Sequence, residues 1–272
     1  MGVDAWVREI GAFSAARTAA GHSAGTVRLQ RHYLVRLCQA MRRGPWSTTT
    51  DDLARWLAGQ TWKRETRRSA IAALRAFWAW GVRTGRTADD PTSGLERVRE
   101  SPPCPRPAPE DVVADSLSRA PETVRLMIRL AAELGLRRAE VARVHGDDLE
   151  RDLLGWTLRV HGKGGKVRVV PVPDDLAVTL RVRCGGGFAF PGRIEGHLSP
   201  GRVGELVGDA LPPGVTMHAL RHRFATRAYA HDRDLLTVQG LLGHASPATT
   251  QRYVVPPADA ARRTVLAVAR AA

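Results

Sequence analysis

The residues best equipped for chemistry lie toward the C-terminus, where two histidines, an arginine and a tyrosine follow one another at short spacing. His218 and Arg221 are three residues apart, so on a helix their side chains share one face and can hold the same anion. His244 follows Gly243, a pairing that favours a helix end and a tight turn. Tyr253 comes nine residues later, and its phenol can act as a nucleophile. This set predicts a site that attacks a phosphodiester and holds its charge.

A lysine in a glycine-rich segment is a second candidate for chemistry. Of the 41 basic residues only three are lysine, namely Lys63, Lys163 and Lys166. Arginine keeps its proton near neutral pH, whereas a lysine whose pKa is lowered can donate one. Lys163 lies between Gly162 and Gly164, so it is a candidate proton donor, with a plain phosphate contact as the alternative. The nearby Lys166 keeps that alternative open.

An arginine further upstream lies where a helix is expected to start. Residues 135–140 read Gly-Leu-Arg-Arg-Ala-Glu, which predicts a junction between two helices. Glu140 comes one turn after Arg137 and can orient it, although an ordinary surface ion pair is an equal alternative. An isolated arginine in a basic chain is by itself a weak indication of function.

The overall charge indicates a polyanionic partner. The 272 residues include 41 lysines and arginines against 27 aspartates and glutamates, which gives a formal net charge of +14 and an isoelectric point near 11.1. Such an excess is typical of proteins that bind nucleic acid, and a merely basic surface is the alternative. No apolar run approaches the ~20 residues of a membrane span, and the N-terminus lacks the apolar core of a signal peptide. Cys38, Cys104 and Cys184 have no metal-ligand or disulfide spacing, so we expect a reducing cytoplasm and no metal.

A proline-rich stretch divides the sequence into two parts. Residues 101–109 read Ser-Pro-Pro-Cys-Pro-Arg-Pro-Ala-Pro, which excludes a regular helix or a central strand and predicts an extended linker. We therefore expect a helical domain over residues 1–98, a linker over 99–110 and a second domain over 111–272.

The first part has the apolar periodicity of helices. Two apolar faces are formed by Val27, Tyr33, Leu34, Leu37 and Met41, and by Ile71, Leu74, Phe77 and Trp78. Asp51 and Asp52 look like an N-cap for a short helix that runs through Leu53, Trp56 and Leu57. A basic cluster starts the last helix and consists of Lys63, Arg64, Arg67 and Arg68. We interpret this cluster as contacting phosphate, with a solvated face as the alternative, so the segment is predicted to be a small DNA-binding module.

The second part is predicted to be mainly helical with one β-hairpin. Helices are expected after Pro109, through Val124–Ala131 and from Leu136 onward. Two β-prone runs, 156–160 and 166–171, flank a glycine-rich turn and predict a hairpin. Helices are expected to resume near Asp174 and to continue to the end, except for a loop at 185–187. The predicted fold class is mainly α with a small β-sheet.

In order and spacing, these motifs resemble those of the tyrosine recombinases, also called the phage integrase family. The pattern of that family is Arg, Lys, His-x-x-Arg, His and Tyr. The matching positions here are Arg137, Lys163, His218, Arg221, His244 and Tyr253. The resemblance covers about residues 20 to 255. It implies a helical core-binding domain followed by a mixed α/β catalytic domain that cuts and rejoins DNA without metal, cofactor or ATP.

The resemblance implies a role for each matching residue. Arg137 and Arg221 would grip the non-bridging oxygens of the scissile phosphate, because bidentate guanidinium contacts stabilise the charge of a pentacoordinate transition state. Lys163 would protonate the departing 5′ oxygen. His218 would assist proton removal from the nucleophile, and His244 would hydrogen-bond the phosphate.

The nucleophile implied by the resemblance is Tyr253, which would form a 3′-phosphotyrosyl link and release a 5′-hydroxyl. The link conserves the energy of the phosphodiester, so no ATP is required. Of the other two tyrosines, Tyr33 lies on an apolar helical face and Tyr229 is expected to pack within a helix. His222 is interpreted as structural, and Lys166 as a DNA contact.

The resemblance also implies the partners and the assembly. These are double-stranded DNA attachment or crossover sites, a homotetramer assembled on DNA, and host or phage accessory factors, with no membrane. The chain starts almost at the expected core-binding domain, so we expect no additional N-terminal arm-site domain. Residues of about 256–272 resemble the tail that family members dock on a neighbouring protomer.

The leading hypothesis is a phage or prophage integrase in the cytoplasm of a bacterial cell, associated with its nucleoid. The alternatives with the same chemistry are a Xer-like or mobile-element resolvase and a type IB topoisomerase. A non-catalytic DNA-binding regulator of the same fold is the alternative from another functional class.

Overall fold

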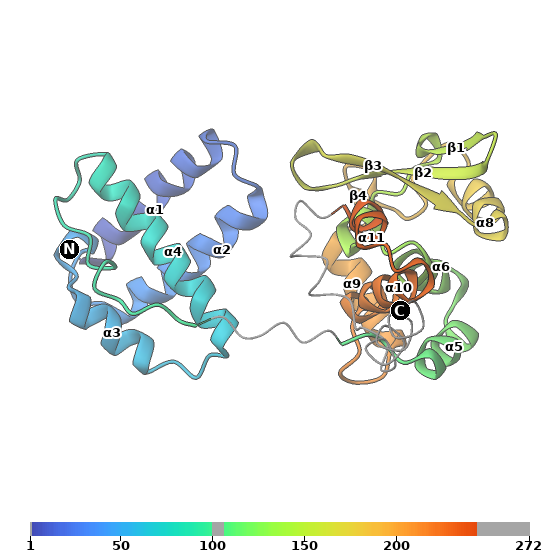
Figure 1. Cartoon of the computed structure of the whole chain (residues 1–272). Coiled ribbons are helices and arrows are strands. Elements are labelled where there is room, and N and C mark those ends of the chain that lie inside the picture. The colour runs from blue at the N-terminus through green and yellow to red at the C-terminus, as the bar shows by residue number, and fades with distance from the viewer. Residues whose placement is uncertain (1, 100–105, 244–272) are drawn as a thin grey trace, which may run out of the picture. The chain divides into compact units, whose positions relative to one another are not determined.

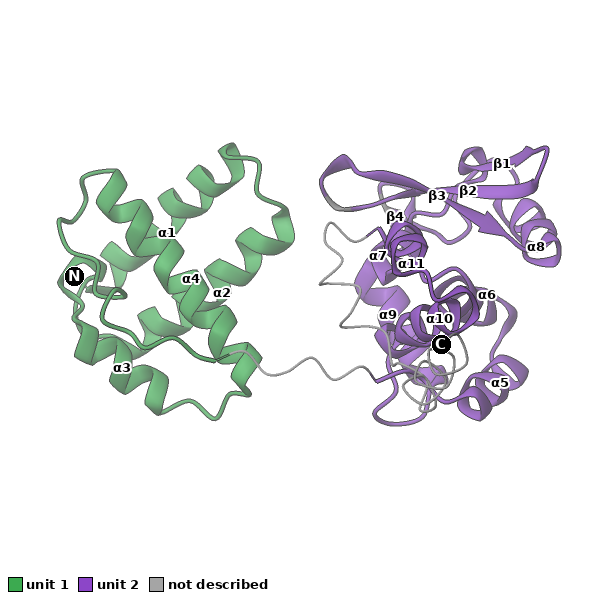
Figure 2. Cartoon of the chain, viewed as in Figure 1, with its two compact units in different colours: residues 1–102 green, residues 103–272 purple. Residues whose placement is uncertain are grey.

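The computed structural model describes residues 2–99 and 106–243, apart from the side chains of Lys163 and Ile194. The chain forms two compact units, Met1–Pro102 and Pro103–Ala272, which are green and purple in Figure 2. Each unit has a hydrophobic core of its own. No helix within the described ranges is long and apolar enough to cross a membrane.

Helices are the regular secondary structure of unit 1 within its described residues, and turns and loops connect them (Figure 1). Its elements are α1 Gly2–Ala19, α2 Ala24–Ala40, the 3-10 turn η1 Pro45–Ser47, α3 Thr50–Ala58 and α4 Arg64–Arg83. The apolar face predicted for α4 is confirmed, since all four of its residues are buried. The face predicted for α2 is confirmed at its centre, where Tyr33, Leu34 and Leu37 are buried, whereas Val27 is half-buried and Met41 is the half-buried C-cap. Aromatic rings fill this core, with Trp46 stacked on Phe77 at 5.1 Å between ring centroids.

The start of α3 differs in detail from the prediction. Thr49 is the N-cap, and its hydroxyl accepts the backbone N–H of Asp52. The Asp52 carboxylate in turn accepts the backbone N–H of Thr49 at 3.1 Å. This capping box satisfies two donors that a helix start leaves open. Asp52 therefore caps the helix from position N3, within the first turn of α3, and is not itself the N-cap residue.

Unit 2 combines helices with short strands (Figure 1). Its helices are α5 Glu110–Arg119, α6 Glu122–Glu133, α7 Arg138–Ala142, α8 Asp174–Cys184, α9 Pro200–Ala210, α10 Met217–Asp232 and α11 Leu235–Leu242. Its strands and 3-10 turns are η2 Gly146–Asp148, β1 Leu149–Asp152, β2 Gly155–His161, η3 Lys163–Gly165, β3 Val167–Val172 and β4 Pro191–Ile194. Helix α6 is central, because it packs against α5, α7, α9 and α10.

The first three strands form an antiparallel sheet in the order β1-β2-β3. The register of β2 and β3 pairs Trp156 with Val172 and His161 with Val167. Helix α8 packs against β1 and β2. The prediction of a mainly α fold with a small sheet is confirmed, but the predicted hairpin gains β1 as a third strand. A fourth short strand, β4, lies where only helices were expected after residue 174, because a four-residue segment that starts with proline gives no strand signal.

Candidate active site

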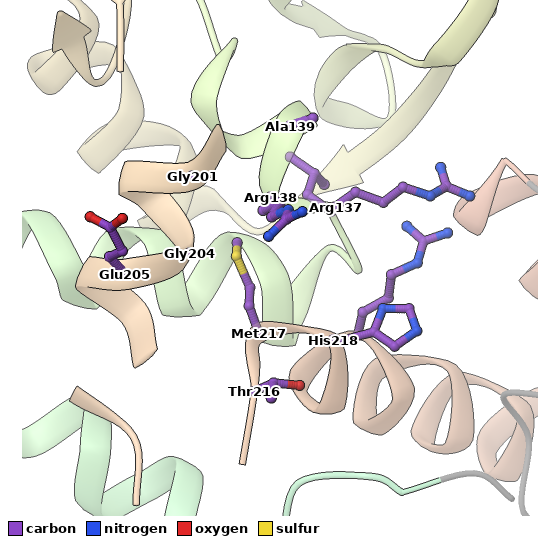
Figure 3. Close-up of a pocket in the computed structure, with 11 residues that line it drawn as sticks. Arg137, Arg138, Ala139, Gly201, Gly204, Glu205, Thr216, Met217 and His218 are labelled. Carbon is purple, nitrogen blue, oxygen red and sulfur yellow. The ribbon is translucent and has the colours of Figure 1, made fainter. Parts of the chain in front are cut away.

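A cavity of about 750 Å³ lies where α7, α9 and α10 begin. It is lined by residues 136–139, by Gly201, Gly204 and Glu205 of α9, and by residues 216–218 and 221. Figure 3 shows Arg137 and His218 on one side of this cavity and Glu205 on the opposite side. The structure thus brings Arg137, His218 and Arg221 together at one cavity.

Helix α10 carries two of these residues. Thr216 caps its N-terminus by accepting the backbone N–H of Ala219. His218 and Arg221 both line the cavity, as their spacing predicted. The Arg221 side chain is 1% exposed, and its guanidinium donates to the carbonyl oxygens of Gly135 and Leu242. Arg221 therefore ties α10 to the turn before α7 and to the end of α11.

The turn before α7 depends on Gly135. Its φ of +66° is in the left-handed region that favours glycine. A Cβ at this position would come within 2.5 Å of the Phe224 ring. Both observations account for glycine at this position, whose carbonyl accepts a hydrogen bond from Arg221.

Arg137 is the N-cap of α7 and takes part in a capping box with Glu140. The Glu140 carboxylate accepts the Arg137 backbone N–H at 2.9 Å and its Nη1 at 2.7 Å. Within the described residues, Nε and Nη2 of Arg137 have no hydrogen-bond partner, and the side chain is 39% exposed. Arg137 is thus held at one edge of its guanidinium and offers the other nitrogens to a ligand.

Glu140 is the buried anion behind this group of arginines. Its side chain is 3% exposed and accepts Nη1 and Nη2 of Arg168 at 2.9 and 2.8 Å. Nη1 of Arg221 lies 3.8 Å from the Glu140 Oε2. Burial by itself raises the pKa of Glu140, but the hydrogen bonds from Arg168 and Arg137 outweigh burial, and the pKa lies below its ordinary value. The interpretation of Glu140 as an orienting partner is confirmed, and the alternative of a surface pair is wrong.

The sequence did not indicate Arg168. On β3, Arg168 shares the inward face with the buried Val170 and Val172, whereas Val167 and Val169 are 54% and 55% exposed. A charged residue on the buried face of a strand is unusual unless it is paired. The only signal in the sequence for an inward Arg168 was the alternation Arg-x-Val-x-Val. Val167 and Val169 on the other face gave the opposite orientation an equally apolar pattern.

Two histidine rings of α10 are in contact at the cavity. The ring centroids of His218 and His222 are 4.8 Å apart. Although His218 is open to the cavity, loss of hydration and the charges of Arg221 and Arg137 lower its pKa. Burial, with smaller effects of His218 and Arg221, lowers the pKa of His222 to about 4. Both rings are therefore neutral near pH 7, and His218 is able to accept a proton.

The lysine predicted at the hairpin tip occupies that place in the backbone. Lys163 begins η3 between β2 and β3, and the next two residues, Gly164 and Gly165, have φ of 74° and 73°. The Gly162 N–H donates to the Lys166 carbonyl at 2.7 Å, which closes the turn. The Lys166 side chain is exposed. The position of Lys163 in the turn between the two strands of the hairpin is confirmed, and its chemical role stays a prediction.

Two of the six predicted catalytic residues, His244 and Tyr253, lie outside the described residues, as does the predicted tail of about 256–272. Helix α11 ends at Leu242, and Gly243 caps it with φ of 62°. The helix end predicted before His244 is thus confirmed. Within the described ranges, no group of three histidine, cysteine, aspartate or glutamate side chains is arranged to hold a metal ion.

The basic cluster of unit 1 is used in two different ways. Lys63 and Arg64 have exposed side chains at the start of α4. Arg67 instead donates to the carbonyl oxygens of Leu57 and Gln60 at 2.6 and 2.9 Å, and so joins α4 to the end of α3. Arg68 pairs with the Glu65 carboxylate at 3.0 Å. Contact of the four residues with DNA stays a prediction, and for Arg67 the structure adds a structural role.

Known proteins similar to this chain fall into one family. Residues 111–258 match the model of the phage integrase family. The chain is 35% identical over 203 residues to tyrosine recombinase XerC of Xanthomonas campestris pv. campestris (strain B100), which covers 67% of this chain and 61% of the relative. It is also 35% identical over 202 residues to tyrosine recombinase XerC of Azotobacter vinelandii, covering 67% of each. The chain thus spans about six tenths of the length of the Xanthomonas relative.

A similar fold occurs in a solved structure of a lambda integrase(75-356) dimer bound to a COC′ core site. The TM-score is 0.74 at 18% sequence identity, and the match covers 93% of this chain and 95% of that chain. At this identity the likeness concerns the fold alone.

Proposed function

Because the chain belongs to the phage integrase family of tyrosine recombinases, we propose that it cuts and rejoins double-stranded DNA at specific sites. In this proposal unit 2 carries the chemistry, and unit 1 is a core-type DNA-binding domain that contacts the duplex through Lys63 and Arg64. Lys166 adds a contact from the hairpin turn of unit 2. The linker expected over residues 99–110 joins the two domains.

One observation supports the proposal most directly: Arg137, His218 and Arg221 converge on a single cavity. Two guanidiniums at one cavity stabilise the negative charge that develops on a phosphate under attack. The N–H groups of Arg137 that point away from Glu140 are the donors best placed for a phosphate oxygen. A neutral His218 beside them supplies a proton acceptor, which a positively charged ring would not.

The reaction follows from the types of these residues. The Tyr253 phenol attacks phosphorus and gives its proton to His218, while the P–O5′ bond breaks and Lys163 gives a proton to the departing oxygen. The products are a 3′-phosphotyrosyl link and a 5′-hydroxyl, and the reverse attack by another 5′-hydroxyl rejoins the strand. In this scheme His244 donates a hydrogen bond to the phosphate.

Covalent trapping tests the proposal. A library of nicked duplexes of random sequence, labelled on the nicked strand, is incubated with the protein, and a covalent product is detected on a denaturing gel. We expect wild type and Tyr229→Phe to form the product, because Tyr229 lies within α10, and Tyr253→Phe to form none. A DNA-linked product from Tyr253→Phe would show that the nucleophile is wrong. Absence of product from wild type would favour the non-catalytic regulator.

The biological reaction has two candidates. The first is integration of phage or prophage DNA between two different attachment sites. The second is Xer-like resolution between identical sites, which the XerC names of the relatives favour. Plasmids that carry the trapped site in direct repeat, or paired with a second selected site, distinguish resolution from integration by the product that forms.

Assembly is part of the same proposal. We expect a homotetramer on two duplexes, accessory factors of host or phage that set direction, and docking of residues of about 256–272 on a neighbouring protomer. Truncation after Pro257 is expected to leave binding to a single site intact and to impair synapsis. Normal synapsis by the truncated protein, in a gel-shift assay with two duplexes, would contradict this part.

A further inference from the structure

Arg168 joins separate segments of unit 2 through one nearly buried side chain, which is 10% exposed. Its Nη1 and Nη2 bind both carboxylate oxygens of Glu140, and its Nε donates to the Leu241 carbonyl at 2.7 Å. All three guanidinium nitrogens are therefore engaged, in two directions. Glu140 belongs to α7, Leu241 to α11 and Arg168 to β3, so a single side chain connects three elements.

The Glu140 side of this link controls how Arg137 is presented. Glu140 accepts only Nη1 from the Arg137 guanidinium, while Arg168 occupies both carboxylate oxygens from the other direction. A carboxylate without Arg168 would have Arg137 as its nearest strong partner, and bidentate pairing would turn the guanidinium away from the cavity. By satisfying Glu140, Arg168 keeps two nitrogens of Arg137 available to a phosphate.

The Leu241 side controls the end of α11. Arg168 holds the Leu241 carbonyl and Arg221 holds the adjacent Leu242 carbonyl at 2.6 Å. These are carbonyls that the last turn of a helix leaves unpaired. The chain leaves the helix at Gly243, where an added Cβ would lie 3.0 Å from the Arg168 Cδ. The two guanidiniums thus fix the end of α11 up to Gly243.

The hairpin that carries Lys163 touches the same network. A Cβ added to Gly162 would lie 3.9 Å from the Glu140 Oε1, so the backbone just before Lys163 runs beside the carboxylate. Arg168 itself follows the turn on β3. A shift of Arg168 would therefore move the hairpin relative to α7.

We infer that Arg168 is a positioning residue for strand cleavage, which fixes Arg137, the Lys163 hairpin and the exit of α11 relative to one another. The inference rests on the proposed function. Lysine cannot replace arginine here, because one ammonium group cannot bind two carboxylate oxygens and a carbonyl on another side.

The test compares Arg168→Lys with Arg159→Lys in the full chain. Arg159 is the matched control, since it lies on the neighbouring strand β2 and pairs with Glu150 at 2.9 Å through a side chain that is 44% exposed. The probe is a nicked duplex recovered from the random-sequence library by covalent attachment to wild type. Under single-turnover conditions, the final covalent yield counts the correctly folded molecules, and the rate constant reports the geometry of their site.

We expect Arg168→Lys to lower the rate constant about 100-fold, the order of effect that a small misplacement of reacting groups produces. The final yield and the affinity for the duplex should stay at the wild-type level, and Arg159→Lys should change none of the three quantities. A reduced yield with a wild-type rate constant would show a purely structural role and overturn the inference, as would a wild-type rate constant with full yield. If wild type itself forms no product, the proposed function fails instead, so the two failures are distinguishable.

A second pair of variants keeps the test decisive if Arg168→Lys does not fold. Gly243→Ala places a Cβ against Arg168 and removes no hydrogen-bonding group. Gly185→Ala is its control, because Gly185 is also a left-handed helix cap, with φ of 53°, and has nothing within 4 Å of an added Cβ. We expect a slower reaction at full yield only for Gly243→Ala, and equal rates for the two variants would overturn the inference.

Discussion

Replacing Glu140 with glutamine should lower the free energy of unfolding of unit 2 by about 3–5 kcal/mol, the usual cost of removing one partner from a buried ion pair. The Glu140 side chain is 3% exposed, binds Arg137 and Arg168, and lies 3.8 Å from the Arg221 guanidinium. Glutamine keeps the shape but directs an NH2 group at guanidinium donors and leaves the positive charges uncompensated. The expected loss is large beside the ~5–15 kcal/mol that stabilises a typical domain.

The effect should depend on pH in a defined direction. The pKa of Glu140 in the folded chain lies below its ordinary value of 4.5. Its contribution to stability is therefore fully present above pH 4.5 and is lost as the pH falls through the lower, folded pKa. The difference in unfolding free energy between wild type and Glu140→Gln should be constant near neutral pH and shrink in acid.

Glu133→Gln is the matched control for this prediction. The Glu133 carboxylate also binds an arginine at two points, Nε and Nη2 of Arg129 at 2.7 and 2.9 Å, but its side chain is 29% exposed. Arg129 retains Asp175 as a second partner at 2.6 Å. We expect a loss of about 0–1 kcal/mol, the usual range for a pair in contact with solvent.

Hydrogen exchange followed by mass spectrometry measures the change in unfolding free energy of unit 2 separately from unit 1. Six of the seven tryptophans belong to unit 1, so fluorescence mainly reports that unit, whereas peptides from residues 110–243 report unit 2. Urea unfolding followed by circular dichroism at several pH values supplies the pH dependence. Equal losses in the two variants, or a loss for Glu140→Gln below about 1 kcal/mol, would refute the view that one carboxylate holds the arginines in place.

Four further predictions concern other parts of the molecule. Lys163→Ala should slow cleavage of ordinary DNA far more than cleavage of DNA with a 5′-phosphorothiolate leaving group, because sulfur leaves without protonation; equal slowing would assign Lys163 to phosphate binding. Gly11→Ala should stabilise unit 1 by about 0.5–1 kcal/mol, because Gly11 lies within α1 with open space around it. Gly81→Ala should destabilise unit 1 by about 1–3 kcal/mol, because its Cβ would lie 2.5 Å from the Trp46 ring. Urea unfolding followed by tryptophan fluorescence measures the change in unfolding free energy for both glycine variants, and a change in the opposite direction would contradict the prediction for that variant. The pKa of His222 is about 4 against an ordinary 6.5, so the unfolded chain takes up the proton first and stability should fall as the pH drops from 6.5 toward 4. His222→Asn should flatten this fall, and an unchanged slope in hydrogen exchange of unit 2 would count against a neutral, partly buried ring.

The parts of the site that could be predicted from the sequence are those that depend on local spacing. His218 and Arg221 share a helix face because a helix repeats every 3.6 residues, and both line the cavity. The same periodicity predicted the buried faces of α2 and α4. Gly135 marked the start of the α7 segment because only glycine fits its backbone and surroundings.

Arg168 could not be predicted in this way, because β3 has valines on both faces. In a strand, a shift of one residue exchanges the inner and outer faces. The sequence Val167-Arg168-Val169-Val170 fits either orientation, and the packing of β3 against α11 and Glu140 selects the one with the arginine inside. The contact partners that decide the orientation lie up to 73 residues away, beyond any local pattern.

Strands β1 and β4 were missed for a related reason. All but the first residue of β1, Leu149–Asp152, are exposed, so the strand has no buried face to give an apolar alternation, and its pairing with β2 defines it. The β4 segment is short and starts with Pro191. Both depend on a partner strand or loop rather than on their own residues.

The hydrogen bonds around Glu140 also bear on the stage of synthesis at which the site at the cavity is assembled. They join residues 28, 73 and 86 positions apart in the chain: Glu140 with Arg168, Arg168 with Leu241, and Gly135 with Arg221. Contacts of such separation form late, because the entropy lost in closing long loops has to be offset by the rest of the fold. A nascent chain that has not reached Leu241 lacks the carbonyl that Arg168 binds. An unfinished molecule therefore has the arginines but not their arrangement, and the site at the cavity is assembled only when unit 2 is complete.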